Sequence, residues 1–159
     1  MVSESHLAYL SLGSNIKPEA NLPAAVNLLN EQGEIQTVSS VWESEPIGTT
    51  GPNYLNACVL FKSGFRQEDL KETVITPIER RLGRYRSADK FAPRPIDIDI
   101  VIFNGRLVNT DVLNLAFVVV PLSEILPSFP NLLTGETLQE TATRLRQGLG
   151  MEVRRGILG

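Results

Sequence analysis

Two aspartates, Asp97 and Asp99, stand two residues apart in the segment PRPIDIDIVIF, residues 93–103. The alternation of acids with isoleucines predicts a β-strand, in which successive side chains point to opposite faces. Both carboxylates should therefore point the same way, about 6.5 to 7 Å apart along the backbone. The isoleucines should enter the core from the other face: Ile96, Ile98, Ile100 and Ile102. Two carboxylates in this arrangement suit Mg²⁺, which binds one or two carboxylates together with substrate phosphates.

The acids also have a simpler explanation, because a sheet with one solvated face alternates apolar and polar residues anyway. Nearby cations favour the metal interpretation; they are Arg80, Arg81, Arg84, Arg86, Lys90 and Arg94. The first two lie near the end of a predicted helix, where the helix dipole explains them. Arg84, Arg86 and Arg94 fall in predicted loops. Arginines beside acid-held magnesium suit phosphoryl transfer, whose catalysis consists mostly of positioning and charge neutralisation.

The whole chain narrows the classes of protein that remain possible. Its 159 residues suffice for one domain, residues 1–159, and are too few for two. A net charge of −3 and the lack of an apolar run of ~20 residues argue against a nucleic-acid or membrane binder. We expect a monomer, and we expect it in the cytoplasm because an acid stands where a signal peptide would be basic. A single cysteine, Cys58, and a single histidine, His6, exclude an internal disulfide and any site that needs two histidines.

The remaining apolar patterns predict the elements that position the acids. Strands are expected at residues 7–12, 36–42, 53–62, 96–103 and 151–153, and Asn104-Gly105 predicts a hairpin that returns residues 106–108 antiparallel. Helices are expected at residues 22–33, at 70–83 with a kink at Pro77, around 123–125 after the apolar piece 117–120, and at 138–145. Residues 43–52 read as a long loop. This order predicts an α+β sandwich, a mainly antiparallel sheet with helices packed against it.

A succession of short motifs resembles one enzyme family. They are L-G-S-N after the first strand, S-E-P-I-G in the long loop, Y-L-N at 54–56, G-R-Y-R at 83–86, P-R-x-x-D-x-D at 93–99 and F-V-V-V-P-L-x-E-I from Phe117. Their order is similar to that in the hydroxymethyl-dihydropterin pyrophosphokinases of folate biosynthesis. The resemblance implies a ferredoxin-like α+β fold. It also implies transfer of the terminal pyrophosphate of ATP to 6-hydroxymethyl-7,8-dihydropterin, with release of AMP.

The resemblance also implies roles for individual residues. Asp97 and Asp99 would hold two Mg²⁺ ions, Arg94 would bind phosphate, and Arg84 and Arg86 would close over the co-substrate ATP. The ATP site would further include Glu79 and Ile100. Tyr54 and Phe117 would lie on the two faces of the flat pterin, and Asn56 would read its hydrogen-bonding edge. The long loop would supply mainly backbone contacts, from Ser44, Glu45 and Ile47. Since Tyr54 and Asn56 share one face of the strand at 53–62, this agrees with the residue pattern. Core packing is the alternative for Tyr54 and Phe117.

The chain departs from the family pattern in two places. Phe91, Ala92 and Pro95 stand where the family more often has a tryptophan, a glycine and a small hydroxyl residue. Between Leu115 and Ala116 the family usually carries a further segment, with a proline–histidine pair and an arginine that contact ATP phosphates. Either the segment is deleted here, or the parent chain has a mobile loop that this sequence omits. A deletion predicts weaker ATP binding and slower turnover, with pterin recognition less affected.

Two other functions remain open at this stage. The chain could be an impaired or non-catalytic pterin-binding relative that lacks part of the ATP site. It could also be an RNA-binding ferredoxin-like module that uses the basic loop, although its net charge and its lack of an aromatic RNP signature argue against nucleic acid as a partner.

Overall fold

The structure is a computed structural model that describes residues 4–46, 50–84 and 92–158. Its strands are β1 (His6–Ser14), β2 (Glu34–Val38), β3 (Val41–Ser44), β4 (Tyr54–Ser63), β5 (Asp97–Phe103), β6 (Arg106–Leu107) and β7 (Glu152–Arg154). Its α-helices are α1 (Pro18–Gln32), α2 (Gln67–Asp69), α3 (Thr76–Arg81), α4 (Ala116–Ile125) and α5 (Leu138–Arg146). The π-helix η1 (Leu70–Ile75) joins α2 to α3, and the 3-10 helix η2 (Thr110–Asn114) precedes α4.

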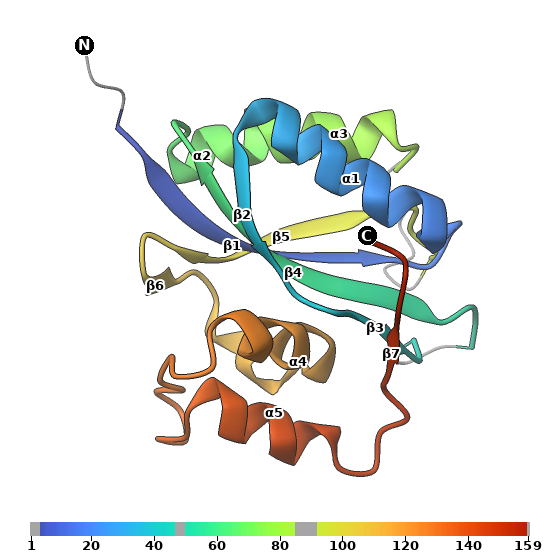
Figure 1. Ribbon diagram of the computed structural model, residues 1–159, viewed down its shortest axis with the longest axis vertical. Coiled ribbons are helices and arrows are strands. Elements are labelled where there is room, and N and C mark those ends of the chain that lie inside the picture. The colour runs from blue at the N-terminus through green and yellow to red at the C-terminus, as the bar shows by residue number, and fades with distance from the viewer. Residues whose placement is uncertain (1–3, 47–49, 85–91, 159) are drawn as a thin grey trace.

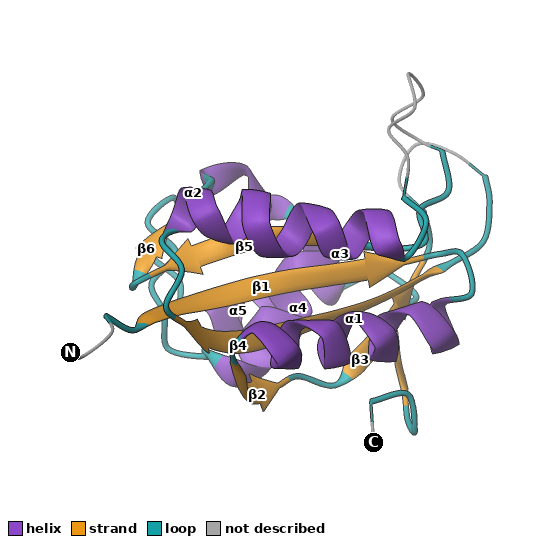
Figure 2. Ribbon diagram, turned by 90° about the horizontal axis from the view of Figure 1, so that it is seen from above, coloured by secondary structure: helices purple, strands orange, loops and turns teal. Residues whose placement is uncertain are grey.

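All strand pairs of the described chain are antiparallel, in the order β6-β5-β1-β4-β3-β7, and β2 also pairs with β4. Taken with the helices, β1-α1-β2/β3-β4-α2/α3-β5 forms the βαββαβ unit of ferredoxin-like folds, which confirms the expected α+β class. Helices cover both faces of the sheet (Figure 1). Helices α1 and α3 lie side by side over one face, and α4 and α5 lie behind the other (Figure 2).

Each face of the sheet carries its own hydrophobic core. Alternate residues of β1 and β4 face α1 and α3, and they include Leu10, Leu12 and Phe61, none of which is exposed. The opposite residues, such as Cys58 of β4, pack against Val118–Val120 of α4 and against Leu138 of α5. The period-two pattern predicted for the strand at 53–62 is therefore confirmed, and both of its faces are covered rather than one.

A bulge in β5 corrects the prediction that all four isoleucines face one core. Tyr9 pairs with Ile102 and Leu10 pairs with Ile100, so Val101 is an extra residue on β5. Before the bulge, Ile98 packs with α1 and α3; after it, Ile102 packs with the opposite core, and Ile100 is only half-buried. The two-residue period therefore ends just after the acids.

Three further elements differ from the sequence prediction. The strand expected at 36–42 is two strands, β2 and β3, separated at Ser39-Ser40. The irregularity expected at Pro77 takes the form of η1, whose wider turn directly precedes a proline that lacks an N–H. The apolar piece at 117–120 is helical, because Val118–Val120 are buried between the sheet and α5 and tertiary burial outweighs the β-preference of valine. Within the described residues no helix combines the length and apolarity needed to cross a bilayer.

Candidate active site

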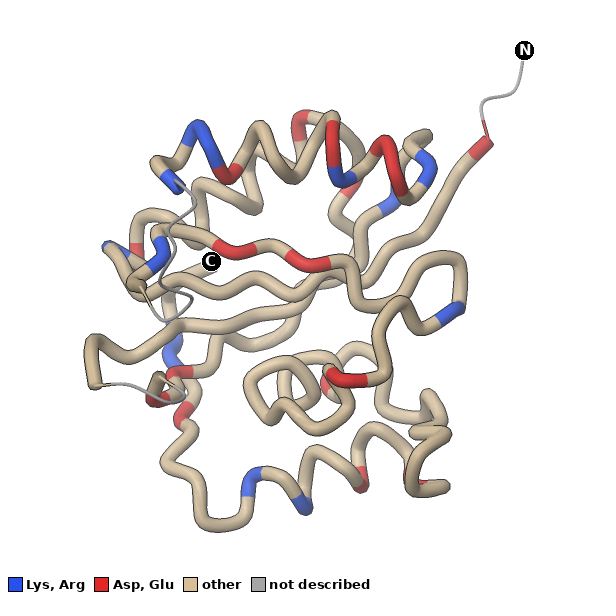
Figure 3. Tube along the Cα trace, turned by 180° about the vertical axis from the view of Figure 1, so that it is seen from behind, with Lys and Arg blue, Asp and Glu red and all other residues tan. Residues whose placement is uncertain are grey.

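Gly13, near the end of the central strand β1, lies between the two sets of residues that the sequence singled out. It pairs with Asn56 of β4 on one side and with Asp97 of β5 on the other. Neighbouring strands lie about 4.8 Å apart. The strand pairing therefore places the predicted pterin amide and the predicted metal carboxylate on the two immediate neighbours of one glycine. The acidic positions of β5 and the basic positions that precede them can be followed in Figure 3.

The carboxylate of Asp97 is held by two arginines. Arg84 Nη1 lies 2.8 Å from Asp97 Oδ1, and Arg94 Nη1 lies 3.0 Å from Asp97 Oδ2. Arg84 also pairs with the carboxylate of Glu79 on α3. The structure thus brings together four predicted ATP-site residues from α3, from the chain after it and from β5. Arg86, predicted to close over ATP, lies outside the described residues.

Glu79 reaches the acidic strand at its open edge. Strand β6 pairs only with Ile102 and Phe103, so the first half of β5 has β1 on one side and no described strand on the other. The backbone N–H of Ile98 donates to Glu79 Oε2 at 2.9 Å, which satisfies a group that would otherwise lack a strand partner. Burial raises the pKa of Glu79 above its ordinary value, although the hydrogen bond from Ile98 and the charge of Arg84 oppose this.

Asp99 lies in an electronegative environment. Neighbouring protein atoms remove part of its water, and the charges of Asp97 and Glu79 repel its own, so the pKa of Asp99 rises to about 6. Lys71 and Arg84 oppose the rise. A bound cation would relieve this repulsion. In residues 4–46, 50–84 and 92–158, no three histidine, cysteine or acidic side chains are grouped as a metal site. Two carboxylates are what a magnesium site shared with substrate phosphates requires from the protein.

Asn56 is fixed from the β3 side. Its side chain is 2% exposed, and its amide donates to the Trp42 carbonyl at 3.2 Å and to Ser44 Oγ at 2.7 Å. Tyr54, two residues earlier, lies at the acidic end of the sheet, where burial raises the pKa of its hydroxyl and Arg94 and Asp97 are its charged neighbours. Gly13 makes room for Asn56, since a β-carbon there would lie 3.3 Å from Asn56 Oδ1, whereas its 3.7 Å distance from Tyr54 Cδ1 would be an ordinary contact.

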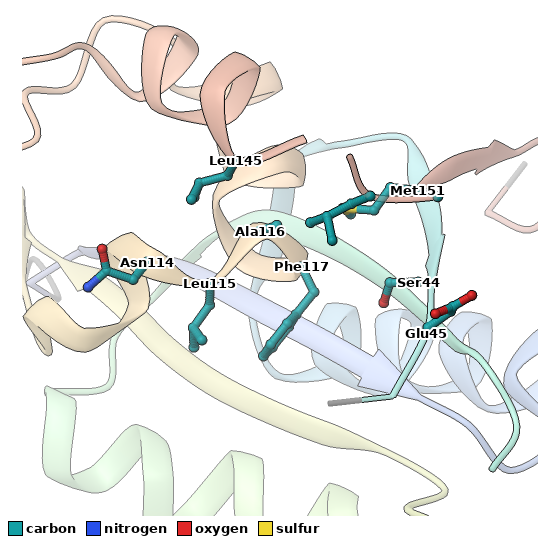
Figure 4. A pocket seen from close by; sticks show the side chains of 10 residues that line it. Ser44, Glu45, Asn114, Leu115, Ala116, Phe117, Leu145 and Met151 are labelled. Atoms are coloured by element: carbon teal, nitrogen blue, oxygen red, sulfur yellow. The ribbon is translucent and has the colours of Figure 1, made fainter. Parts of the chain in front are cut away.

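Phe117, Ser44 and Glu45 line a cavity of about 200 Å³. Figure 4 shows the three side chains around it, with the ring of Phe117 extending from the start of α4. Tyr54 is not among the residues that line this cavity. Ser44 connects this cavity to Asn56, because it lines the cavity and its Oγ accepts a hydrogen bond from the Asn56 amide. Ile47 lies outside the described part of the chain.

Some residues of the site had not been expected from the sequence. The cavity is also lined by residues at and after the end of α5, which are Leu145, Leu149, Gly150 and Met151. The helical spacing of Leu138, Ala142 and Leu145 was a signal for the first of them. Asn15 of the L-G-S-N turn contacts Arg94 through two hydrogen bonds. Its signal was the L-G-S-N motif itself, for which no individual role was predicted.

The chain passes directly from η2 to α4 at Leu115, where the family pattern expects a longer segment. The Leu115 N–H donates to the Val112 carbonyl at 3.0 Å, and the Leu115 carbonyl accepts from Val119 N–H at 2.9 Å. Leu115 thus ends one helix and begins the next. Asn114, Leu115 and Ala116 at this junction border the Phe117 cavity.

Comparisons with known proteins agree with this arrangement. The model of the family described as 7,8-dihydro-6-hydroxymethylpterin-pyrophosphokinase (HPPK) matches residues 9–127. The 2-amino-4-hydroxy-6-hydroxymethyldihydropteridine pyrophosphokinase of Bacillus subtilis is 33% identical over 161 residues, covering 93% of this chain and 95% of the relative. The enzyme of that name from Methylorubrum extorquens is 37% identical over 150 residues, covering 87% and 92%.

A solved structure shares the fold. The crystal structure of Plasmodium falciparum HPPK-DHPS with pteroate matches with a TM-score of 0.70 at 12% identity, over 93% of this chain. The match covers 44% of that longer protein, so this chain spans less than half of it. The family match over residues 9–127 and the two relatives show that the chain belongs to the HPPK family and is an enzyme of pyrophosphoryl transfer in folate biosynthesis.

Proposed function

We propose that this enzyme transfers the terminal pyrophosphate of ATP to the hydroxymethyl group of 6-hydroxymethyl-7,8-dihydropterin in the presence of Mg²⁺. The observation that carries the proposal is the pairing of Gly13 with both Asn56 and Asp97. Because each neighbouring strand lies about 4.8 Å away, an amide for the pterin and a carboxylate for metal-bound phosphate flank one open backbone position. Donor and acceptor substrates would meet there.

The acidic strand supplies the protein's share of a magnesium site. Asp97 and Asp99 would hold two ions, which when bound would neutralise charge on the ATP phosphates. The donor set fits, because both ligands are hard carboxylate oxygens and the pKa of Asp99 is raised by burial and by the neighbouring acids Asp97 and Glu79. Asp97 must then exchange part of its contact with Arg84 and Arg94 for the ion, which leaves the two guanidinium groups for phosphate oxygens.

The arginines and Glu79 would organise the reacting phosphates. In the reaction, the hydroxymethyl oxygen attacks the β-phosphorus, the bond from that phosphorus to the oxygen bridging it to the α-phosphorus breaks, and AMP leaves with that electron pair. Arg94 and Arg84 would bind the transferred group, and Arg86 is proposed to assist them. Glu79 would set the orientation of Arg84 through their ion pair. Ile100, half-buried beside the bulge of β5, is proposed as an apolar contact for the nucleotide.

On the acceptor side, Asn56 would read the hydrogen-bonding edge of the pterin, and Ser44 would hold that amide in place. Tyr54 and Phe117 are proposed to contact the two faces of the ring, with Glu45 and Ile47 contributing from the loop after β3. Phe117, Ser44 and Glu45 line one cavity, which supports their place in this proposal.

A second candidate function is an impaired, pterin-binding relative. The observation that favours it is the direct junction at Leu115, where η2 runs into α4 without the segment that would supply further phosphate contacts. This candidate predicts pterin binding of ordinary strength and weak binding of ATP. Calorimetric titration of each ligand in the presence of Mg²⁺ separates the two candidates.

The decisive test is AMP formation from ATP, Mg²⁺ and the hydroxymethyl-dihydropterin. The unmodified enzyme should form AMP only when the pterin is present, and Asp97→Ala and Asp99→Ala should reduce AMP formation to background while retaining the fold. Asp69→Ala, which changes an exposed aspartate on α2, is the matched control and should remain active. A double alanine variant at 97 and 99 with full activity would refute the metal role. Light scattering would test the proposed monomer, and fractionation of cells would test the proposed cytoplasmic location.

A further inference from the structure

Arg94 carries the only backbone N–H in the sequence Pro93-Arg94-Pro95. Neither proline carries an N–H, and a residue that precedes a proline is restricted to extended conformations. The one available N–H, that of Arg94, donates to Asn15 Oδ1 at 2.7 Å. The Arg94 carbonyl accepts from the backbone N–H of Asn15 at 3.0 Å. Both backbone polar groups of Arg94 are therefore bonded to one residue, 79 positions earlier in the chain.

Asn15 is well placed to hold another segment rigidly. It is only 6% exposed, and it lies one residue beyond the end of β1, the strand that pairs with both β4 and β5. The turn that carries it is closed by hydrogen bonds from Ser14 Oγ and Asn21 Nδ2 to the carbonyl of Ile16, at 3.1 and 2.6 Å. The position of Asn15 is therefore set by the centre of the sheet.

These contacts fix the base of the Arg94 side chain relative to the acids. The guanidinium reaches Asp97 Oδ2 at 3.0 Å, and Asp97 is paired with Gly13, two residues before Asn15. Arg94 is therefore linked to the end of β1 in two ways, through its backbone to Asn15 and through its guanidinium to Asp97, the strand partner of Gly13. A displacement of the Arg94 backbone by about 1 Å would break the ion-pair geometry, and misplacements of that size are costly in active sites.

We propose that Asn15 is a positioning residue for phosphate binding, which holds the Arg94 backbone so that its guanidinium meets Asp97 and the phosphates of ATP. The proposal rests on the proposed function, in which Arg94 binds phosphate. It gives the L-G-S-N turn a role: Gly13 leaves space for Asn56, and Asn15 orients the phosphate-binding arginine.

The test uses α,β-methylene-ATP, an analogue whose α–β bridge cannot be cleaved. Calorimetry measures how tightly two matched asparagine variants bind this analogue in the presence of Mg²⁺. Asn15→Ala should weaken binding of the analogue about tenfold, the scale expected for one lost hydrogen bond to a buried group. Asn30→Ala is the control, because Asn30 Oδ1 also accepts a backbone N–H, that of Ile35 at 3.0 Å, on the exposed end of α1. It should leave binding unchanged.

A double-mutant cycle separates positioning from a general structural role. In an Arg94→Ala background there is no guanidinium to orient, so Asn15→Ala should weaken analogue binding by less than about twofold. The KM for the pterin should also stay close to that of the unmodified enzyme. An equal loss in both backgrounds, or a matching rise in the KM for the pterin, would overturn the proposal.

If Asn15→Ala does not fold, Asn15→Asp keeps an oxygen acceptor for the Arg94 N–H and should retain most of the analogue affinity. A loss in Asn15→Asp greater than about tenfold that is equally large in the Arg94→Ala background would contradict the proposal. The proposed function fails separately, if the unmodified enzyme forms no AMP. In that case the comparison of analogue binding still decides the role of Asn15.

Discussion

The Glu79 carboxylate accepts a hydrogen bond from the backbone N–H of Ile98, at 2.9 Å, and so fastens α3 to the strand between the two aspartates. Glu79→Ala would leave that N–H without a partner at the edge of β5. We expect Glu79→Ala to lower the free energy of unfolding by about 1–3 kcal/mol. Glu79→Gln keeps an oxygen acceptor and should cost less, while its lost charge frees Arg84 from one ion pair.

Urea unfolding of the two Glu79 variants measures this difference, and AMP formation measures the effect on activity. Both variants should be less active than the unmodified enzyme, because Arg84 is paired with Glu79 and Asp97 together. Glu72→Ala, an exposed acid on η1, is the control for loss of a helix carboxylate. Equal stability of Glu79→Ala and the unmodified enzyme would show that the contact to Ile98 contributes nothing to the fold.

Gly13→Ala should weaken pterin binding more than ATP binding. The new β-carbon would lie 3.3 Å from Asn56 Oδ1, which is tighter than an ordinary contact. Asn56 cannot yield easily, because its amide is bonded to the Trp42 carbonyl and to Ser44 Oγ. Overpacking of this kind costs about 1–3 kcal/mol of folding stability. A displaced Asn56 amide would also no longer match the pterin edge, and we expect roughly tenfold weaker pterin binding.

Calorimetry with the pterin and with the methylene analogue of ATP checks the Gly13 prediction. Gly64→Ala is the matched control, since its β-carbon would meet only the Glu4 carbonyl, at an ordinary 3.7 Å. A Gly13→Ala enzyme that binds the pterin as tightly as the unmodified enzyme would mean that Asn56 moves freely or does not read the pterin.

Glu124 of α4 supports the pterin side of the sheet through the chain's single tryptophan, Trp42. Its carboxylate accepts hydrogen bonds from the indole N–H of Trp42 and from Ser40 Oγ, the latter at 2.8 Å, and Arg146 lies 4.6 Å from the centre of the indole ring. Glu124→Ala should cost about 1–3 kcal/mol, since hydrogen bonds to a charged group are lost. Arg146→Ala should cost about 0.5–1 kcal/mol through the exposed cation–π contact.

Because Trp42 is the only tryptophan, its fluorescence during urea unfolding reports both variants directly. Glu124→Ala should also shift the emission of the folded protein, as the indole N–H loses its acceptor, and should weaken pterin binding because the Trp42 carbonyl holds Asn56. The expected order of stability is unmodified enzyme, Arg146→Ala, Glu124→Ala. The reverse order would show that the cation–π contact holds Trp42 in place.

The parts of the fold and site that could be predicted from sequence are those set by local patterns. Alternation placed Asp97 and Asp99 on one strand, and Asn104-Gly105 formed the expected hairpin because both residues adopt positive φ, 48° and 80°. The bulge at Val101 could not be predicted, since it depends on pairing with β1. Only the end of helix α4, around residues 123–125, was predicted; its first half was missed because Val118–Val120 favour strands locally and are helical only through burial on both sides.

The charged residues of the candidate site could be recognised in the sequence, but the contacts between distant residues could not. The acids and arginines were evident from charge and spacing, since they cluster within a short stretch of chain. The bonds between Asn15 and Arg94, or between Trp42 and Glu124, join residues far apart in sequence, and no periodic pattern links them. Leu149 and Met151 belong to the cavity only because the chain after α5 returns to β3 through β7.

The raised pKa of Asp99 predicts that the metal-free enzyme loses stability as the pH rises. The pKa is about 6 in the folded protein and 3.8 for an ordinary aspartate, so folding favours the protonated form. Below pH 3.8 the group is protonated in both states and has no effect; between pH 3.8 and 6 its ionisation progressively opposes folding, and above pH 6 the full cost is present. Asp99→Asn should therefore be clearly more stable than the unmodified enzyme at pH 8, and most of that difference should be gone at pH 4. Urea unfolding at both pH values in the presence of a chelator measures this, with Asp69→Asn, an exposed aspartate on α2, as the control.

Excess Mg²⁺ should reduce the difference between Asp99→Asn and the unmodified enzyme at pH 8, because an ion bound at Asp99 offsets the same repulsion. A difference between Asp99→Asn and the unmodified enzyme that does not change with pH would contradict the predicted repulsion from Asp97 and Glu79.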